Sequence, residues 1–170
     1  MDVGWVLPVC WLSLGLIVVG CSVGASRSRR VFGIGIVAVA TLWVAAGAGA
    51  NLSFLIQGED FSGFADQAST AFVRDTWESL VVPHHHVFIG LLIAFEAGAG
   101  AAVLVTGRVR QVALVLLIAF NVALLSFGWG YLMWSVPLVA ALESLRRADR
   151  RWSIGVAEAL RPAGPARTAR

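Results

Sequence analysis

The 170-residue sequence is poor in charge and contains no lysine. Only 14% of its residues are charged, and all 13 basic residues are arginine. Soluble domains average about 25% charged and about 45–50% apolar residues, whereas 58% of this chain is hydrophobic. A water-soluble enzyme is therefore excluded as the default. A disordered chain is excluded too, because it needs low hydrophobicity and high charge. A small polytopic membrane protein remains.

Cysteine is scarce, and the common motifs of soluble catalysis are missing. Cys10 and Cys21 fall in one apolar segment, and in a helix they would lie about 16 Å apart along the axis. A disulfide needs Cα atoms within about 7 Å, so an internal bridge is excluded. The sequence has no glycine-rich phosphate loop, no Ser–His–Asp spacing and no basic, aromatic surface for nucleic acid. We therefore expect no nucleic-acid partner.

Long apolar runs dominate the sequence, and a membrane-spanning helix needs about 20 such residues. The first run is not typical of a signal peptide, because Asp2 precedes it and the arginines follow it. The last run is short, contains Pro137, and is joined to the fourth at Gly128 as a tight hairpin. We predict an all-α integral membrane bundle with five transmembrane helices at residues 4–24, 31–52, 87–106, 112–127 and 129–145.

Arginines in loops set the orientation of such a bundle, because arginine resists translocation. Five spans place every arginine group but one on the same side: Arg27, Arg29, Arg30, Arg108, Arg110, Arg146, Arg147, Arg150, Arg151, Arg161, Arg167 and Arg170. The loop 53–85 on the other side carries five acidic residues against Arg74. We predict the N-terminus outside and the C-terminus in the cytoplasm. The use of arginine alone, with abundant alanine, glycine and valine, favours a GC-rich bacterium and its plasma membrane.

Three parts follow from this pattern. Residues 1–30 form an extra N-terminal helix with a cytoplasmic arginine loop, residues 31–147 form a four-helix bundle, and residues 148–170 form a basic cytoplasmic tail. The tail contains proline and glycine, and it is interpreted as a disordered, topogenic end. The alternative is that it recruits anionic lipid or a cytoplasmic partner.

The outer loop 53–85 shows helical periodicity. The repeating apolar residues are Phe61, Phe64, Ala68 and Phe72. Asp60 or Ser62 is available as an N-cap. Two interpretations stay open: an amphipathic helix at the membrane interface with Trp77 as a belt residue, or a surface helix packed on the bundle.

Glu96, near the middle of the third span, is the main candidate for chemistry. A carboxylate at the bilayer centre costs at least ~2.5–3.5 kcal/mol, so it should face the bundle interior, where desolvation favours the protonated form. One interpretation is an acid that handles protons or anchors a ligand; the other is a neutral carboxyl bonded to a neighbouring helix. Asn121 is the expected partner because it lies at similar depth on an antiparallel helix, and Thr41 is at the same level.

The triplet His84, His85 and His86 follows Pro83 at the outer end of the third span. Three imidazoles suggest a metal site. Successive helical residues diverge by about 100°, however, so the three cannot converge on one ion from a regular helix. No other helix holds a histidine, so a bis-His haem cannot form within one chain. The cluster could titrate near neutral pH or accept protons from a quinol, or it could be a polar interfacial cap.

Aromatic residues gather at the outer end of the last hairpin. They are Trp129, Tyr131 and Trp134, with Trp5 and Trp11 at the same membrane level. They are interpreted as belt anchors; alternatively, they wall a flat apolar ring such as a quinone head.

Small residues punctuate the second and third spans. They are Gly47, Gly49, Ala50, Gly98, Gly100 and Ala101. Such residues let two helices approach closely, so we predict tight packing between these two spans.

Residues 61–147 contain four short motifs: Phe64-Ala65, Glu96-Ala97-Gly98-Ala99-Gly100, Thr106-Gly107-Arg108 and Phe127-Gly128-Trp129. This region resembles the DoxX-like superfamily of small bacterial four-helix membrane proteins. The resemblance covers the second to fifth helices and leaves the first as an extra. It implies a link to membrane redox systems, including quinone-linked oxidation of sulfur compounds and complexes against oxidative stress. It also makes Glu96 the residue of greatest interest.

The expected function is a small accessory subunit of a quinone-linked membrane redox complex, not a catalyst on its own. Its quinone pocket would be lined by Glu96, Asn121, Trp129 and Trp134. The expected partners are the bilayer and other membrane subunits. Two alternatives remain: a non-catalytic assembly subunit, and a small-solute or proton carrier, against which the absence of paired broken half-helices argues.

Overall fold

The computed structural model describes residues 6–159, with side chains through Ser153, and this part of the chain is helical without strands. The elements are α1 (Val6–Gly24), α2 (Arg29–Thr41), η2 (Leu42–Ala48), α3 (Gly49–Ile56), η3 (Ser62–Ala65), α4 (Ala71–Thr76), η4 (Trp77–Val81), η5 (Val82–His84), α5 (His85–Ala102), α6 (Arg108–Leu124), η6 (Leu125–Phe127) and α7 (Trp129–Ala159). The predicted all-α class is confirmed.

Four helical stretches in the described chain are long and apolar enough to cross a membrane. They are Val6–Gly24, Arg29–Ile56, Ala71–Ala102 and Arg108–Phe127. The fifth predicted span lies in α7 but is not among them. Its apolar part is short because Glu143 and the arginines that follow end it.

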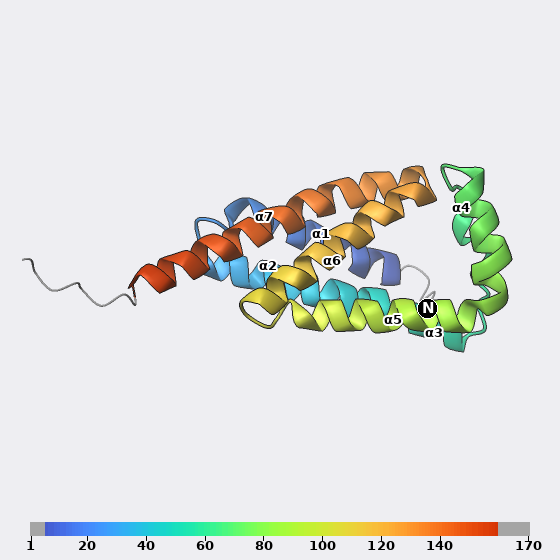
Figure 1. Ribbon diagram of the computed structural model, residues 1–170, viewed down its shortest axis with the longest axis horizontal. Helices are drawn as coiled ribbons and strands as arrows, with labels where there is room; N and C mark the ends of the chain where they lie inside the picture. The colour runs from blue at the N-terminus through green and yellow to red at the C-terminus, as the bar shows by residue number, and fades with distance from the viewer. Residues whose placement is uncertain (1–5, 160–170) are drawn as a thin grey trace, which may run out of the picture.

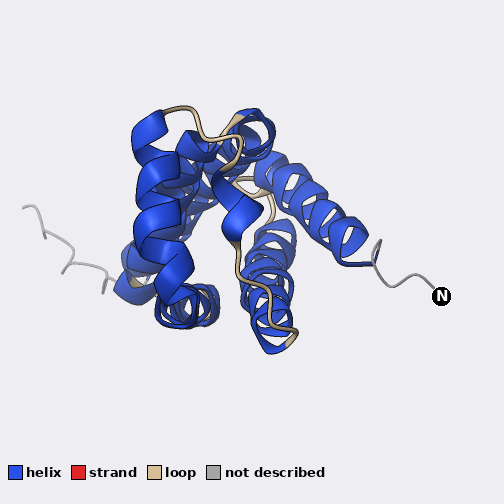
Figure 2. Cartoon of the chain, turned by 90° about the vertical axis from the view of Figure 1, so that its right-hand side faces the viewer, coloured by secondary structure: helices blue, strands red, loops and turns tan. Residues whose placement is uncertain are grey.

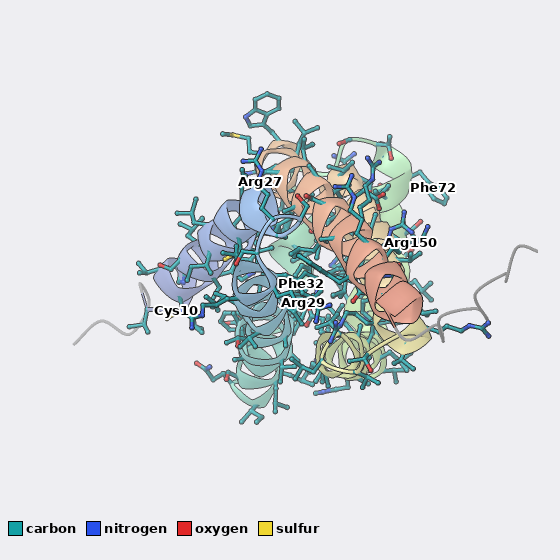
Figure 3. The ribbon with its side chains drawn as sticks, turned by 90° about the vertical axis from the view of Figure 1, so that its left-hand side faces the viewer. Cys10, Arg27, Arg29, Phe32, Phe72 and Arg150 are labelled. Carbon is teal, nitrogen blue, oxygen red and sulfur yellow. The ribbon has the colours of Figure 1, made fainter. Side chains whose placement is uncertain are left out.

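The long helices run along the molecule, while α4 crosses one end (Figure 1). Figure 2 looks onto that end and shows the helices joined by short loops. The α1–α2 and α5–α6 turns, which carry arginine, lie at the opposite end (Figure 1). This end faces the viewer in Figure 3, which labels Arg27 and Arg29, and Arg150 on α7. The basic end and the acidic outer segment therefore lie at opposite ends of the bundle.

Two glycines allow the helix formed by α2, η2 and α3 to pack closely on α5. A Cβ on Gly100 would lie 2.9 Å from Val44 Cγ2 and 3.0 Å from Trp43 Cβ. A Cβ on Gly47 would lie 3.0 Å from Glu96 Oε1. The predicted close approach is therefore confirmed at these two positions.

Helix α7 continues to Ala159, far beyond the end predicted for the fifth span. The side chain of Asp149 is buried and forms an ion pair with Arg110 at 2.9 Å. The indole Nε1 of Trp152 donates to the carbonyl of Ala25 at 3.1 Å. The prediction of a disordered tail from residue 148 is wrong for residues 148–159, because Asp149 and Trp152 attach this part to the bundle. Residues 160–170 of the tail, and Trp5, lie outside the described residues.

The outer segment, residues 57–84, is not the single amphipathic helix that its periodicity suggests. Phe61 has a left-handed backbone (φ 60°) before η3, and Thr70 starts α4 by accepting a hydrogen bond from the N–H of Val73 at 3.3 Å. Asp60 accepts from the N–H of Ser62 at 2.9 Å, which lowers the pKa of the Asp60 carboxyl. Phe72 points outward (Figure 3) and is 78% exposed. The left-handed residue before η3 and the Thr70 cap of α4 therefore divide the apolar stripe between two short helices.

Candidate functional site

A cavity of about 630 Å³ lies inside the bundle, toward the end that α4 crosses. Side chains from α1, η2, α3, α5, α6 and α7 line it, together with the outer segment. Its walls are mainly apolar and aromatic, with Trp43, Leu92 and Phe120 among them. Apart from indole N–H groups, polar groups are few: the carboxyl of Glu96, the amides of Asn51 and Asn121, and the hydroxyl of Tyr131. An apolar cavity with a few convergent polar groups is the usual form of a small-molecule site.

Glu96 is buried and faces the bundle interior, as the cost of a carboxylate in a membrane predicts. The side-chain amide of Asn51 on α3 donates a hydrogen bond to Glu96 Oε2 at 2.8 Å. The carboxyl rests against Gly47, which leaves it room because it has no side chain. The acid is thus held from the neighbouring helix by one amide and one glycine.

The segment η2 brings these groups together. It is a π-helical segment in which the N–H of Gly49 bonds the carbonyl of Val44, five residues back. Single π turns inside α-helices are often found at functional sites. Several η2 residues line the cavity, Trp43 and Gly47 among them. The change of helical register therefore occurs at the wall of the cavity.

Asn121 is not the partner of Glu96, although the sequence suggested it. It is buried and lines the same cavity, but its amide donates to the carbonyl of Leu117 on its own helix at 2.8 Å. Thr41 is exposed and bonds the carbonyl of Val37 at 3.0 Å. The second span continues to Ile56, which places Asn51 inside the helix and not at its end. The position of Asn51, a polar residue directly after the small-residue run, is the sequence signal that could have indicated it.

Trp134 lies in the cavity wall and Trp129 does not. Trp134 stacks on Trp11 of α1, with ring centroids 3.5 Å apart and planes 22° apart. It also lies against Gly15, where a Cβ would collide with the indole. Trp129 is 72% exposed. Five residues rotate a helix by about 500°, so these two tryptophans point to different faces, and Trp129 is not brought together with the other predicted pocket residues.

An aromatic cluster covers the end of the cavity. It consists of Phe64, Trp77, Phe127 and Tyr131, all of which line the cavity. The ring of Phe64 lies 4.8 Å from Trp77, 5.1 Å from Phe127 and 5.4 Å from Tyr131. Trp77 donates from Nε1 to the carbonyl of Phe61 at 2.8 Å. Trp77 is therefore packed between the outer segment and the α6–α7 turn.

The three histidines lie at the junction of η5 and α5 and outside the cavity lining. His85 Nδ1 lies 2.9 Å from the carbonyl of Val82, and its ring is 4.2 Å from that of His86. Within residues 6–159, no three histidine, cysteine or acidic side chains lie together in a way that could hold a metal ion. The structure therefore gives no support to a metal site at His84, His85 and His86.

No family model, no curated protein and no solved structure matches the chain. The chemistry of the site thus follows from its own residues. A protonated Glu96 can donate one hydrogen bond to a ligand while Asn51 holds its second oxygen. Trp11 and Trp134 offer apolar ring surface in the same cavity. The cavity suits a flat, apolar molecule that carries an oxygen acceptor.

Proposed function

We propose that the chain is a five-span protein of the bacterial plasma membrane, with its N-terminus outside and its C-terminus in the cytoplasm. Four helices of sufficient length and apolarity support insertion, and the apolar part of α7 supplies the fifth span. The arginines at one end and the acidic outer segment at the other support this orientation. The cavity then lies in the outer half of the bilayer.

We propose that the protein is a small accessory subunit of a quinone-linked redox complex, and that the cavity takes the quinone head. The carrying observation is a buried carboxyl in an aromatic-walled cavity of about 630 Å³, within the range of about 300–1,000 Å³ that ligand sites occupy. The resemblance of residues 61–147 to the DoxX-like superfamily agrees with it. A bound quinone supplies two-electron, two-proton chemistry.

The chain itself contributes binding and proton handling. Glu96 hydrogen-bonds a ring oxygen and exchanges a proton with it, and Asn51 fixes the carboxyl. Trp134, stacked on Trp11, supports the ring face. The electrons come from partner membrane subunits.

A quinone titration tests this function. The purified chain in nanodiscs is titrated with a short-tailed quinone, and tryptophan fluorescence is followed because Trp11, Trp43, Trp77 and Trp134 line the cavity. Saturable quenching is expected. Glu96→Gln keeps the shape of the side chain but removes its exchangeable proton. It should lower the quinone-dependent activity of the native complex by about a hundredfold, the lower range of a lost proton-transfer group.

Glu78→Gln is the matched control, because Glu78 is exposed and outside the cavity. Its activity should equal that of the wild type. Unchanged activity in Glu96→Gln would remove the proton role. Absence of saturable quenching would remove the quinone site and favour the assembly-subunit alternative.

A second pair of variants tests the geometry of the acid. Gly47→Ala places a Cβ against the Glu96 carboxyl and should weaken quinone binding about fivefold. In Gly49→Ala the new Cβ meets only the carbonyl of Val44, at an ordinary 3.6 Å, and binding should not change. Equal quinone affinity in the two variants would show that the position of the carboxyl is unimportant.

A further inference from the structure

A second cavity, of about 440 Å³, lies between α5 and α6 at the arginine-bearing end. Small residues of α5 line one side, among them Gly98 and Ala102, and the first turns of α6 line the other. A Cβ on Gly98 would have no atom within 4 Å. The space between these helices is therefore a real groove, which we call the α5–α6 groove.

The groove has one apolar end and one charged end. Phe95 lines it and packs on Phe120 at 5.3 Å, which separates it from the larger cavity. Arg108 lines the opposite end, at the first residue of α6. Val112 and Leu116 form an exposed apolar rim, 57% and 45% accessible. The groove thus opens to the side of the bundle, where lipid lies if the helices span a membrane.

Four of the other arginines at this end form ion pairs or side-chain hydrogen bonds. Arg110 pairs with Asp149, Arg146 and Arg147 pair with Glu143, and Arg150 donates to Gln111. Among residues with described side chains, Arg108 forms no ion pair, and neither do Arg27, Arg29, Arg30 and Arg151, but of these five only Arg108 lines the groove. Its exposed guanidinium remains available, and the uncapped start of α6 adds positive partial charge beside it.

The length of the groove matches one leaflet of a bilayer. Its lining spans nine residues, or eight helical steps, on each helix, from Ala94 to Ala102 and from Arg108 to Leu116. At 1.5 Å per residue this is about 12 Å, compared with about 15 Å for half of a hydrocarbon core. An acyl chain fits this depth while its headgroup stays at the level of Arg108.

We infer that the α5–α6 groove is a binding site for one anionic phospholipid, whose acyl chain lies in the groove and whose phosphate pairs with Arg108. Charge complementarity selects this occupant, because a neutral apolar helix would leave Arg108 without a counter-ion. The site depends on membrane insertion but is independent of the quinone function. It explains why the groove is lined by small residues next to an unpaired arginine.

Native mass spectrometry of the full chain in a neutral detergent tests the site. Dioleoyl phosphatidylglycerol and dioleoyl phosphatidylcholine, which share the same tails, are added in equal amounts. We expect one phosphatidylglycerol to be retained preferentially. Arg108→Gln should reduce its retention about fivefold, the contribution of one arginine near an anionic surface.

Two further variants make the test specific. Arg151→Gln removes the same charge from an exposed position on α7 outside the groove, and lipid retention should be unchanged. Gly98→Leu fills the groove and should reduce retention, and thermal unfolding confirms that this variant folds. The quinone titration of both variants should match the wild type.

Three outcomes would overturn the inference. An equal loss of lipid retention in Arg151→Gln and Arg108→Gln would mean that the basic surface attracts anionic lipid without a specific site. Equal retention of the two lipids would mean that the groove does not recognise the charge of the headgroup. A change of oligomeric state in Gly98→Leu, with unchanged lipid retention, would mean that a second copy of the chain covers the groove.

Discussion

Replacing Asp149 by alanine is expected to lower the free energy of unfolding by about 3 kcal/mol. The Asp149 and Arg110 side chains are 6% and 12% exposed, and their ion pair measures 2.9 Å. Arg110 also donates to the carbonyls of Val103 and Leu104, at 2.7 and 3.3 Å, and so caps the end of α5. Loss of the carboxylate leaves a buried guanidinium without its counter-ion. The measurement is chemical unfolding in mixed micelles, followed by circular dichroism.

Arg147→Ala is the control for the buried pair. Its guanidinium is 72% exposed and pairs with Glu143 on the surface of α7. The free energy of unfolding should therefore change by less than about 1 kcal/mol. The double replacement Arg110→Met with Asp149→Leu should recover part of the stability, because an apolar pair replaces both charges while the carbonyls of Val103 and Leu104 lose their donor. The explanation is wrong if the double variant is as unstable as Asp149→Ala.

Gly128→Ala should be the second most damaging substitution. Gly128 has φ 116° and ψ −174°, a region that is essentially restricted to glycine and costs about 1–3 kcal/mol for other residues. A Cβ there would also collide with the backbone carbonyl of Gln67. Nearby, the N–H of Ser69 donates to the carbonyl of Ser126 at 2.9 Å. The substitution should therefore release the outer segment from the α6–α7 turn and uncover the aromatic cluster.

Hydrogen exchange of residues 62–76 measures this release directly, and the rate should rise in Gly128→Ala. Gly130→Ala is the matched control, because Gly130 lies in α7 and a Cβ there has no atom within 4 Å. Alanine favours a helix interior by up to about 1 kcal/mol, so this variant should be at least as stable as the wild type. Similar exchange in both variants would contradict the proposed attachment.

The helical fold could be predicted because apolar runs and charges report on the chain locally. The apolar runs predicted the long helices. The arginine groups were predicted to lie together at one end of the bundle, and the structure places them there. From the sequence, however, Arg110 looks like the other arginines of the cytoplasmic loops. Nothing in its neighbourhood predicts that it pairs with a carboxylate 39 residues away. That pairing depends on how α6 packs against α7, and the sequence of either helix alone does not determine this packing. For this reason α7 was predicted to end too early.

The candidate site was predictable in part for the same reason. The cost of burying a carboxylate placed Glu96 in the interior without knowledge of its neighbours. Predicting the hydrogen-bond partner of Glu96 requires the rotational phase and the length of the second helix. Neither follows from the apolar pattern, so depth in the membrane favoured Asn121, whereas the partner is Asn51. Likewise, whether Trp129 or Trp134 faces the cavity depends on the rotational orientation of α7 in the bundle.

The π segment η2 gives the second helix one residue that regular winding would not need. A π segment accommodates one residue more than regular α-helical winding would, so the helix keeps its phase on either side. Deleting one residue between Leu42 and Ala48 would let the helix close into regular α winding with Asn51 still facing Glu96. Deleting one residue from α2, where the winding is regular, would instead turn everything after it by about 100°. In an evolutionary comparison, a one-residue deletion in η2 would therefore be compatible with the site, whereas one in α2 would not.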